Sequence, residues 1–445
     1  MHSDSVVDPR TLQELYLTGF EIAVREGEPK CIMTSYNRLN GTYTNEDRHL
    51  LRDILVDEWG FRGFVVTDWG GSNNHVAGVA SGSHLEMPAP GQASDRELVE
   101  AVRAGRVSQA WVNQMAEELL RVAETISIPD DAPSDFDRMA HHVFARRAAA
   151  ETIVLLKNQG DLLPLAPGTR VAVIGDLAGQ PRFQGSGSSN VNPTQVDCPL
   201  DELTASELKV VGYAPGYLRH GGKDANLCQQ AVQLAQKADV VLLYLGLDEL
   251  AETEGMDRKD LALRDNQNAL LEAVCQVNPK VVVVLAGGAP VELPWLEHCP
   301  ALVYGSLSGQ AGAGAMVDVL TGKVNPSGKL AESWPLKLAD TPCAQWYPGR
   351  EASAQYREGL FVGYRYYQTA HVPVQFPFGF GLSYTTFRYS QLEVEEGQVS
   401  FTLTNTGTRE GAEVAQLYVS KPDSGIVRPA LELKGFSKVR LAPGE

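Results

Sequence analysis

The sequence predicts an α/β protein that ends in an antiparallel β-sandwich. Three observations predict this fold class. Amphipathic helices alternate with short apolar strands in the first part of the chain, and the middle part has longer, almost wholly apolar strands. After Phe376, apolar and polar residues alternate one by one. Strand–helix alternation implies a parallel sheet, whereas a period of two is typical of a sandwich with one wet face.

The first part of the chain is predicted to contain two or three strand–helix units. Its expected elements are helices at Pro9–Glu26, Asp47–Glu58 and after the N-cap Ser108, and strands at Cys31–Tyr36, Gly63–Asp68 and near Leu85–Met87. Two or three units are too few to close an eight-stranded barrel.

A stretch rich in Pro and Asp, at 128–133, is interpreted as a linker. The strands expected after it are Thr152–Leu156, Arg170–Ile174, Ala238–Leu245, Lys280–Leu285 and Ala301–Tyr304. Helices are expected at Asn226–Lys237 and Asn266–Val277. Such continuous Val, Ile and Leu runs are typical of strands that are covered on both faces, so this region is predicted to be a doubly wound α/β sandwich.

The bulk composition excludes several classes of partner. With 38 basic and 55 acidic residues the net charge is −17, and such a surface repels nucleic acid and anionic membranes. The six cysteines lie far apart without metal-ligand spacing, and no apolar run reaches the roughly 18 residues of a membrane span. A neutral ligand such as a sugar is compatible with this composition.

Residues 63–70, Gly-Phe-Val-Val-Thr-Asp-Trp-Gly, are the most informative stretch. An apolar run delivers the carboxylate of Asp68 to the end of a strand, where parallel barrels carry their active sites. Trp69 beside it offers a flat wall on which a sugar ring could stack. The alternative is that Asp68 only caps a helix in a strand-to-helix turn.

A second acidic motif follows the strand that ends near Gly246. The loop Glu252-Thr-Glu-Gly-Met-Asp-Arg258 places Glu254 before a glycine, and the Asp257–Arg258 pair could pin the loop. Sheets of this class use the loops beyond the carboxyl ends of their strands for ligands. The alternative is a solvated charged loop without function.

Taken together, these motifs resemble glycoside hydrolase family 3, which includes many β-glucosidases. The stretches that carry the resemblance occur in the family's order over nearly the whole chain. They are Ser5–Leu12, Met33–Gly41, Gly63–Gly70, Leu85–Pro88, Val154–Asn158, Glu252–Arg258, Asn325–Leu330 and Phe376–Tyr384.

The resemblance implies a retaining, exo-acting hydrolase that removes terminal β-D-glucosyl residues without metal or organic cofactor. Asp68 matches the family's nucleophile and Glu254 its general acid/base, and retention needs two carboxyl groups roughly 5–5.5 Å apart. An upward shift in the pKa of Glu254 is expected, because a filled cleft would shield it from water.

Four further residues match sugar-binding positions of the family. Tyr36 and Met33 match positions that line the subsite, although Met33 could equally be packed in the core. Trp69 matches the stacking wall. Ser188 matches a serine that approaches the sugar from the second domain, although Ser186 could be the true equivalent. The surrounding Gly-Ser loop lacks the Gly-Lys-Ser/Thr ending of a phosphate-binding P-loop.

The sequence departs from the family at its beginning, where a Lys-His pair, an Arg and an early Asp that bind sugar hydroxyls have no counterpart. The expected domains are the carboxyl-terminal part of a (β/α)8-type barrel at 1–128, a linker and helix at 129–150, the α/β sandwich at 151–335, a second linker at 336–375, and an incomplete fibronectin type III-like sandwich at 376–445. An incomplete barrel leaves unpaired strand edges, so this chain alone is expected to be weakly active or inactive.

Several alternatives stay open at this point. The activity could be that of a β-xylosidase or β-glucan exohydrolase on the same scaffold. The chain could also be a non-catalytic carbohydrate-binding fragment. A homo-oligomer, or a separate amino-terminal segment, could complete the barrel around a β-glucoside or oligosaccharide substrate.

Overall fold

A computed structural model describes residues 3–128, 135–349 and 351–445, and these form two compact units. The first unit, which we call unit 1, comprises residues 1–135 and 345–362. The second, unit 2, comprises residues 136–344 and 363–445. The α/β class is confirmed. The predicted linker at 128–133 lies, apart from Ile128, outside the described residues.

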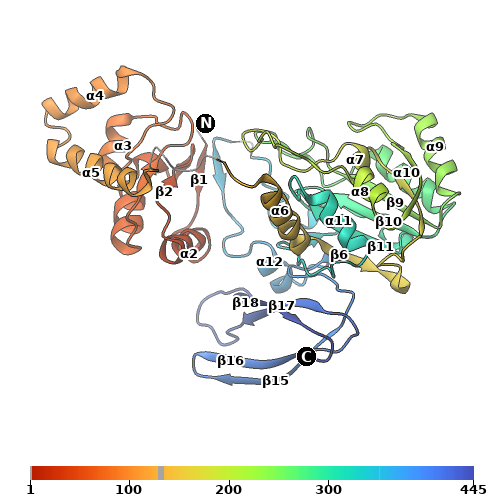
Figure 1. Cartoon of the computed structure of the whole chain (residues 1–445). Helices are drawn as coiled ribbons and strands as arrows, with labels where there is room; N and C mark the ends of the chain where they lie inside the picture. The colour runs from red at the N-terminus through yellow and green to blue at the C-terminus, as the bar shows by residue number, and fades with distance from the viewer. Residues whose placement is uncertain (1–2, 129–134, 350) are drawn as a thin grey trace. The chain divides into compact units, whose positions relative to one another are not determined.

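Unit 1 contains two small sheets and a set of helices (Figure 1). Its strands are β1 (Asp4–Val6), β2 (Cys31–Met33), β3 (Arg38–Leu39), β4 (Thr42–Tyr43), β5 (Phe64–Val66) and β13 (Ser353–Gln355). Its helices are α1 (Pro9–Thr11), α2 (Thr18–Gly27), α3 (His75–Ser81), α4 (Gln92–Arg103) and α5 (Gln109–Ile126), with π-helical turns η1 (Leu12–Tyr16) and η3 (His49–Glu58) and the 3₁₀ turn η2 (Thr44–Glu46).

The parallel pair β2–β5 forms the centre of unit 1. Met33 pairs with Val66, and an isolated bridge joins Val66 to Leu85 where a third strand was expected. Val65 is fully buried under the apolar side of η3, and Ser108 caps α5 as predicted by accepting a hydrogen bond from the Trp111 N–H. The other sheet has the order β13-β1-β3-β4. Its strand β13 comes from within the segment 336–375 that was expected to be a linker.

Unit 2 is built around a six-stranded sheet with the order β6-β11-β10-β9-β7-β8 (Figure 1). Its strands are β6 (Val154–Asn158), β7 (Arg170–Ile174), β8 (Lys209–Ala214), β9 (Val240–Gly246), β10 (Val281–Ala286) and β11 (Ala301–Ser306). All of these pair in parallel except β6, an antiparallel strand at the edge.

Helices cover both faces of this sheet. The helices are α6 (Arg138–Thr152), α7 (Asp176–Gly179), α8 (Pro199–Ala205), α9 (Ala225–Ala235), α10 (Asp265–Cys275) and α11 (Gly312–Leu320), with 3₁₀ turns η4 (Gln159–Asp161) and η5 (Leu296–His298). In β9, Val241, Leu243 and Leu245 face α9 and α10, whereas the intervening residues face α6, α8 and α11. Both faces of the sheet are therefore shielded from solvent, which explains the continuous apolar runs in its strands.

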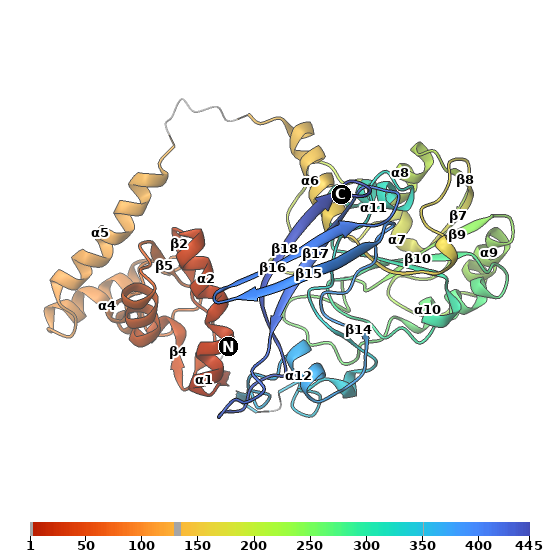
Figure 2. The same ribbon diagram turned by 90° about the horizontal axis from the view of Figure 1, so that it is seen from below.

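The remainder of unit 2 consists of short connecting elements and two long hairpins (Figure 2). The connecting elements are β12 (Trp334–Pro335), η6 (Leu338–Asp340), α12 (Tyr364–Thr369) and β14 (Val374–Phe376). The hairpins are β15 (Phe387–Glu395) with β16 (Gln398–Asn405), and β17 (Gly411–Val419) with β18 (Glu432–Leu441).

Two further features of the described residues bear on partners. None of their helices is both long and apolar enough to span a bilayer. All six cysteines are described and are free thiols.

Candidate active site

Asp68 lies just beyond the carboxyl end of β5 in unit 1. Gly63 allows the strand to start close to its neighbour, because a Cβ there would lie 2.4 Å from the Lys30 carbonyl oxygen. The Asp68 Oδ1 accepts a hydrogen bond from the adjacent Trp69 N–H at 2.6 Å, and the Asp68 carbonyl accepts one from the Gly71 N–H at 2.8 Å. The helix that follows is capped by Asn74 instead, so the helix-capping interpretation of Asp68 was wrong.

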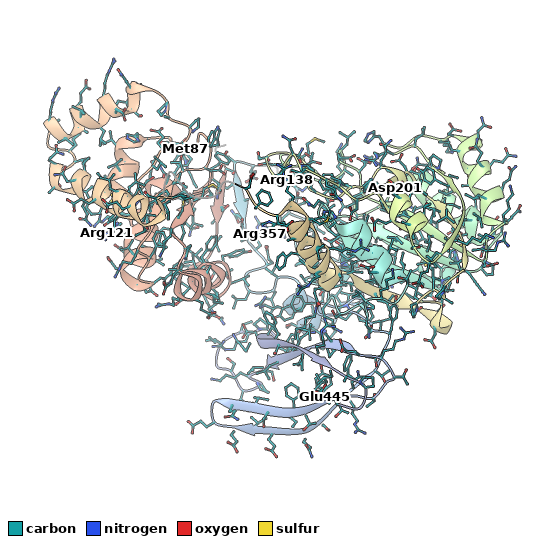
Figure 3. The ribbon with its side chains drawn as sticks, viewed as in Figure 1. Met87, Arg121, Arg138, Asp201, Arg357 and Glu445 are labelled. Atoms are coloured by element: carbon teal, nitrogen blue, oxygen red, sulfur yellow. The ribbon has the colours of Figure 1, made fainter. Side chains whose placement is uncertain are left out.

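The turn after Asp68 is held from two sides. The Tyr36 hydroxyl donates to the Trp69 carbonyl at 2.9 Å. The Gly70 N–H donates to the carbonyl of Met87, which is labelled in Figure 3. Trp69 itself is 63% exposed. A rigid turn therefore presents an open aromatic face next to a carboxylate, an arrangement suited to stacking against a sugar ring.

Met33, at the end of β2, lines an apolar cavity of about 320 Å³ within unit 1. Leu12, Phe20, Ile32 and Trp59 also line it. Met33 is 60% exposed, so it is not packed in the core as the alternative interpretation held.

Glu254 lies in the loop that follows β9 in unit 2. Its carboxylate Oε2 accepts a hydrogen bond from the Ser188 N–H at 2.6 Å, and its own N–H donates to the Ser186 carbonyl at 3.2 Å. Gly187 makes this approach possible, because its φ is +99° and a Cβ there would lie 2.5 Å from the Glu254 Cβ. The structure thus brings Ser188 and Glu254 together within one unit.

The pKa of Glu254 is shifted in the direction opposite to the one expected. The Ser188 hydroxyl and N–H both stabilise the carboxylate, so the pKa of Glu254 lies below its ordinary value. The expectation of an upward shift assumed shielding from water, whereas the Glu254 side chain is exposed.

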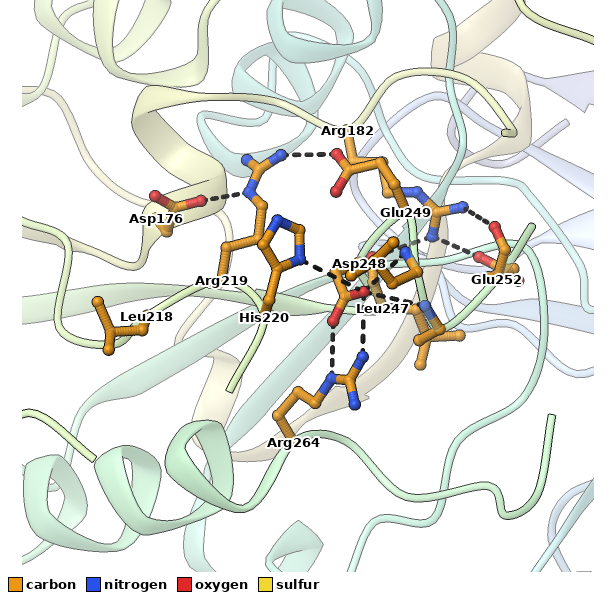
Figure 4. Close-up of polar contacts among 12 residues, drawn as sticks. Asp176, Arg182, Leu218, Arg219, His220, Leu247, Asp248, Glu249, Glu252 and Arg264 are labelled. Atoms are coloured by element: carbon orange, nitrogen blue, oxygen red, sulfur yellow. Dashed lines mark hydrogen bonds and ion pairs between the residues drawn. The ribbon is translucent and has the colours of Figure 1, made fainter. Parts of the chain in front are cut away.

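The loop that carries Glu254 is fixed by ion pairs that the sequence did not reveal (Figure 4). The Arg182 Nη1 contacts the Glu252 Oε2 at 2.5 Å, and the Arg264 Nε contacts the Oδ2 of buried Asp248 at 2.7 Å. The proposed pin at Asp257–Arg258 takes another form, since the Arg258 Nη1 donates to the Pro290 carbonyl. No local motif could have identified Arg182, because 70 residues separate it from Glu252.

A third arginine joins the loops at the same ends of β7, β8 and β9 (Figure 4). The Arg219 Nε contacts the Asp176 Oδ2 and its Nη1 contacts the Glu249 Oε1, both at 2.6 Å. Strands β7 and β9 are neighbours in the sheet while β8 lies on the outer side of β7, which makes this end the topological switch point where such sheets bind ligands. The described residues contain no group of three or more His, Cys, Asp or Glu side chains that could hold a metal ion.

Unit 1 thus has a strand-end carboxylate beside an exposed tryptophan, and unit 2 has a second carboxylate on a loop beyond a strand of its doubly wound sheet. The chain belongs to glycosyl hydrolase family 3. Residues 2–122 match the family's N-terminal domain, residues 153–384 match its C-terminal domain, and residues 413–445 match the fibronectin type III-like domain.

Known relatives cover the chain from end to end. Thermostable β-glucosidase B of Acetivibrio thermocellus is 44% identical over 100% of this chain and 60% of its own length. An exo-α-(1→6)-L-arabinopyranosidase of Bifidobacterium breve is 42% identical over 99% of this chain and 60% of its own length. The crystal structure of a β-glucosidase from Bifidobacterium adolescentis superposes with a TM-score of 0.95 at 41% identity, over 100% of this chain and 66% of that one. The chain thus spans about three fifths of the length of the first two relatives.

Proposed function

We propose that this chain carries the catalytic carboxylates of a retaining, exo-acting β-glucosidase that removes terminal non-reducing β-D-glucosyl residues. The observation that carries the proposal is the pairing of Asp68 and exposed Trp69 at the end of β5, in a chain that is 44% identical to a β-glucosidase. Family membership adds support, because the matched stretches include both candidate carboxylates.

In the proposed reaction Asp68 is the nucleophile. Its carboxylate attacks the anomeric carbon while the glycosidic carbon–oxygen bond breaks, and Glu254 donates its proton to the leaving oxygen. Water then attacks the glycosyl-enzyme, Glu254 takes the proton from that water, and Asp68 leaves as a carboxylate. The substrate's own atoms and one water balance both steps, so the proposal includes no metal or organic cofactor.

The lowered pKa of Glu254 suits the second step better than the first. The Ser188 N–H stabilises the carboxylate form, which is the form that accepts a proton from water. To act as an acid, Glu254 must be protonated, and a protonated carboxyl oxygen cannot keep the same bond at full strength. Because a carboxyl group has two oxygens, the proposal places the transferred proton on Oε1 and leaves Oε2 facing the Ser188 N–H.

Sugar binding is assigned to the residues around these two carboxylates. We propose that Trp69 stacks on the sugar ring, that Tyr36 and Met33 line the same subsite, and that Ser188 approaches it from the second domain. The half-exposed Tyr36 keeps its hydroxyl on the Trp69 carbonyl, so its role would be to hold the stacking ring in place.

For the domains we propose the arrangement that the family resemblance implies. Residues 1–128 would be part of a (β/α)8-type barrel, residues 151–335 the α/β sandwich, and residues 376–445 a partial fibronectin type III-like sandwich. The parallel β2–β5 pair with its helices supports the first assignment.

Substitution of the two carboxylates tests the proposal. The variants are made in the native form of the protein and compared with the unsubstituted protein. Asp68→Ala should lower turnover of p-nitrophenyl β-D-glucoside by at least about 10³-fold, and azide should not restore retention. Glu254→Ala should cost about 10²–10⁴-fold on substrates with poor leaving groups and far less on activated aryl glucosides.

Matched carboxylates serve as controls for these variants. Asp53 in unit 1 and Glu297 in unit 2 have side chains that are 56% and 85% exposed, and their alanine variants should keep full activity. Equal losses by Glu254→Ala on both kinds of substrate would show that Glu254 is not the acid. Substrate binding without any turnover in the native protein would favour a carbohydrate-binding fragment.

The identity of the sugar can be decided with a set of aryl glycosides. The 42% identical arabinopyranosidase makes α-L-arabinopyranoside a specific competitor to glucoside as the substrate. The same scaffold would also suit a β-xylosidase or a β-glucan exohydrolase. A higher kcat/KM for aryl β-D-glucoside than for the xyloside and the arabinopyranoside would support the proposal, and the reverse order would replace glucose with the preferred sugar.

A further inference from the structure

Arg182 is the most deeply buried arginine among the described residues, since its residue exposure is 6% and that of its side chain only 1%. Its guanidinium makes three contacts with a single loop (Figure 4). The Nη1 donates to the Leu247 carbonyl at 2.9 Å and to the Glu252 carboxylate, and the Nη2 donates to the Glu252 carbonyl at 3.1 Å. One side chain thus holds the loop both where it leaves β9 and five residues further on.

The Glu252 carboxylate is fixed on its other side as well. Both of its oxygens accept from the Gly288 N–H, at 2.9 and 3.0 Å. A Cβ at position 288 would lie 2.9 Å from the Glu252 Oε1, so a larger residue there would displace this carboxylate. Glu252 therefore joins Arg182 to the end of β10, and it does so two residues before Glu254.

The chain on the other side of Arg182 leads directly to the partner of Glu254. The segment 184–191 is closed by the Gln184 side chain, which exchanges two hydrogen bonds with the Val191 backbone at 3.0 and 3.1 Å. At its tip the Ser186 carbonyl and the Ser188 N–H both contact Glu254. Arg182 thus lies at the base of two loops that meet again at the Glu254 carboxylate.

We infer that Arg182 and Glu252 are positioning residues for Glu254, because their buried ion pair locks the 182–190 and 247–254 loops into the one arrangement that sets Ser188 on the Glu254 carboxylate. The inference rests on the proposed acid/base role of Glu254. Neither residue touches the reacting atoms in this scheme. Their effect is to fix where the proton-transferring oxygen lies, and small misplacements of such a group lower the rate strongly.

A second cluster of ion pairs in unit 2 offers a control. Arg146 in α6 contacts two carboxylates, Asp318 at 2.7 Å and Glu202 at 2.9 Å, and none of these three residues belongs to either loop. If the Arg182 pair only stabilised the fold, Arg146→Met and Arg182→Met would have the same kinds of effect. If it positions Glu254, only Arg182→Met should change the surroundings of that carboxylate.

The first test does not depend on activity. Hydrogen exchange of peptides covering 183–191 and 249–257 is compared in the full chain, and Arg182→Met should speed exchange of the Ser188 and Glu254 amides by at least about tenfold. In a ¹³C titration assigned through Glu254→Gln, Arg182→Met should raise the pKa of Glu254 toward its ordinary value, because the Ser188 donors no longer stay in place. Arg146→Met should change neither. Unchanged exchange and an unchanged Glu254 pKa in Arg182→Met would overturn the inference.

The second test uses the native, active form of the protein. Arg182→Met should lower kcat for poor leaving groups at least about tenfold more than for activated aryl glucosides, as loss of an acid does, with little change in KM. If Glu254→Ala shows that selectivity and Arg182→Met does not, the positioning role is wrong while the proposed function stands. If Glu254→Ala lacks it, the proposed function fails, and the exchange and titration results still decide whether the ion pair fixes the loop.

Conservative variants cover the case in which Arg182→Met does not fold. Arg182→Lys keeps the charge but cannot reach three acceptors at once, so it should give a smaller change in the same direction. Glu252→Gln keeps the shape of the side chain and should match Arg182→Met in both measurements. If both folded variants left Glu254 unchanged, the inference would again be overturned.

Discussion

Gly246 and Gly19 illustrate how the surroundings of a single residue decide whether a substitution by alanine stabilises or destabilises the fold. At Gly246, the last residue of β9, a Cβ would lie 2.1 Å from the Ala286 carbonyl oxygen on β10. Because the obstacle is backbone in the centre of the sheet, it cannot move aside. We therefore expect Gly246→Ala to destabilise unit 2 by about 3 kcal/mol, measured as a lower midpoint of its thermal transition in scanning calorimetry.

Gly19 lies in helix α2, where a Cβ would meet nothing within 4 Å. Here the alanine only restricts the unfolded chain and favours the helix, so Gly19→Ala should stabilise unit 1 by about 0.5–1 kcal/mol. Shifts of the same sign in the two variants would contradict this account of both glycines.

The residues of the candidate site divide into those a sequence can reveal and those it cannot. Asp68 and Trp69 follow a strand directly, so one short motif contains both the scaffold and the chemistry. Arg182 contributes through partners 65 and 70 residues away, and nothing near it in the sequence indicates a buried charge. The downward shift of the Glu254 pKa could not be predicted either, since it depends on the hydroxyl and the N–H of Ser188 in a distant loop.

The strands that could be predicted from the sequence are those whose residues are buried on both faces of the sheet. β7, β9, β10 and β11 lie close to their predicted positions because almost all their residues are buried. The strand β8 (Lys209–Ala214) was missed, since it lies at the sheet edge, is mostly half-buried and contains a glycine. β13 could not be predicted from its three exposed residues, because its pairing with β1 spans most of the chain.

A buried polar network links three elements of unit 1 and should make its stability depend on pH. Glu118 of α5 accepts two hydrogen bonds from Arg52 of η3 and contacts the His84 Nε2, while the His84 Nδ1 accepts from the Val65 N–H of β5. Burial would raise the pKa of Glu118, but these hydrogen bonds outweigh it and hold the pKa at about 2. Burial lowers the pKa of His84, against the pull of Glu118.

Both shifts lower the folded-state pKa, so both act in the same direction. Above the unfolded-state pKa values, near 6.5 for His84 and 4.5 for Glu118, their stabilising contributions are complete. As the pH falls, the unfolded chain takes up protons first, and the stability of unit 1 should decrease, first below about 6.5 and then further between 4.5 and 2. Urea unfolding of unit 1, measured in steps from pH 7 to about pH 2, should show this decline.

Removing the acid of the network provides the control. Glu118→Gln should destabilise unit 1 by about 2 kcal/mol at pH 7, because Arg52 loses its charged partner. It should remove the decline in stability between pH 4.5 and pH 2, whereas the decline below pH 6.5, which comes from His84, should remain. His49→Gln, in an exposed pair with Asp53, should leave both the stability and its pH dependence nearly unchanged. A decline between pH 4.5 and pH 2 that survived in Glu118→Gln would assign that part of the pH dependence to other groups.

For the chain as a whole, the excess of 55 acidic over 38 basic residues sets a second dependence on pH. The net charge of −17 keeps copies apart at neutral pH, and this repulsion disappears near the isoelectric point of about 5.0. We therefore expect a solubility minimum near pH 5, measured as turbidity across pH 3.5–8. The same charge should prevent binding to DNA or to anionic vesicles at physiological salt.

The two pH effects overlap between pH 6.5 and pH 5, but their physical origins separate them. Solubility depends on the magnitude of the net charge, so it should recover below pH 5, where the chain becomes positive. The His84–Glu118 contribution depends on protonation of particular groups, so it should keep falling below pH 5 without recovery. Glu118→Gln changes the net charge by only one, from −17 to −16, and should leave the turbidity maximum in place while flattening the unfolding profile below pH 4.5. A variant that moved both curves together would show that loss of the folded state, and not loss of charge, drives precipitation.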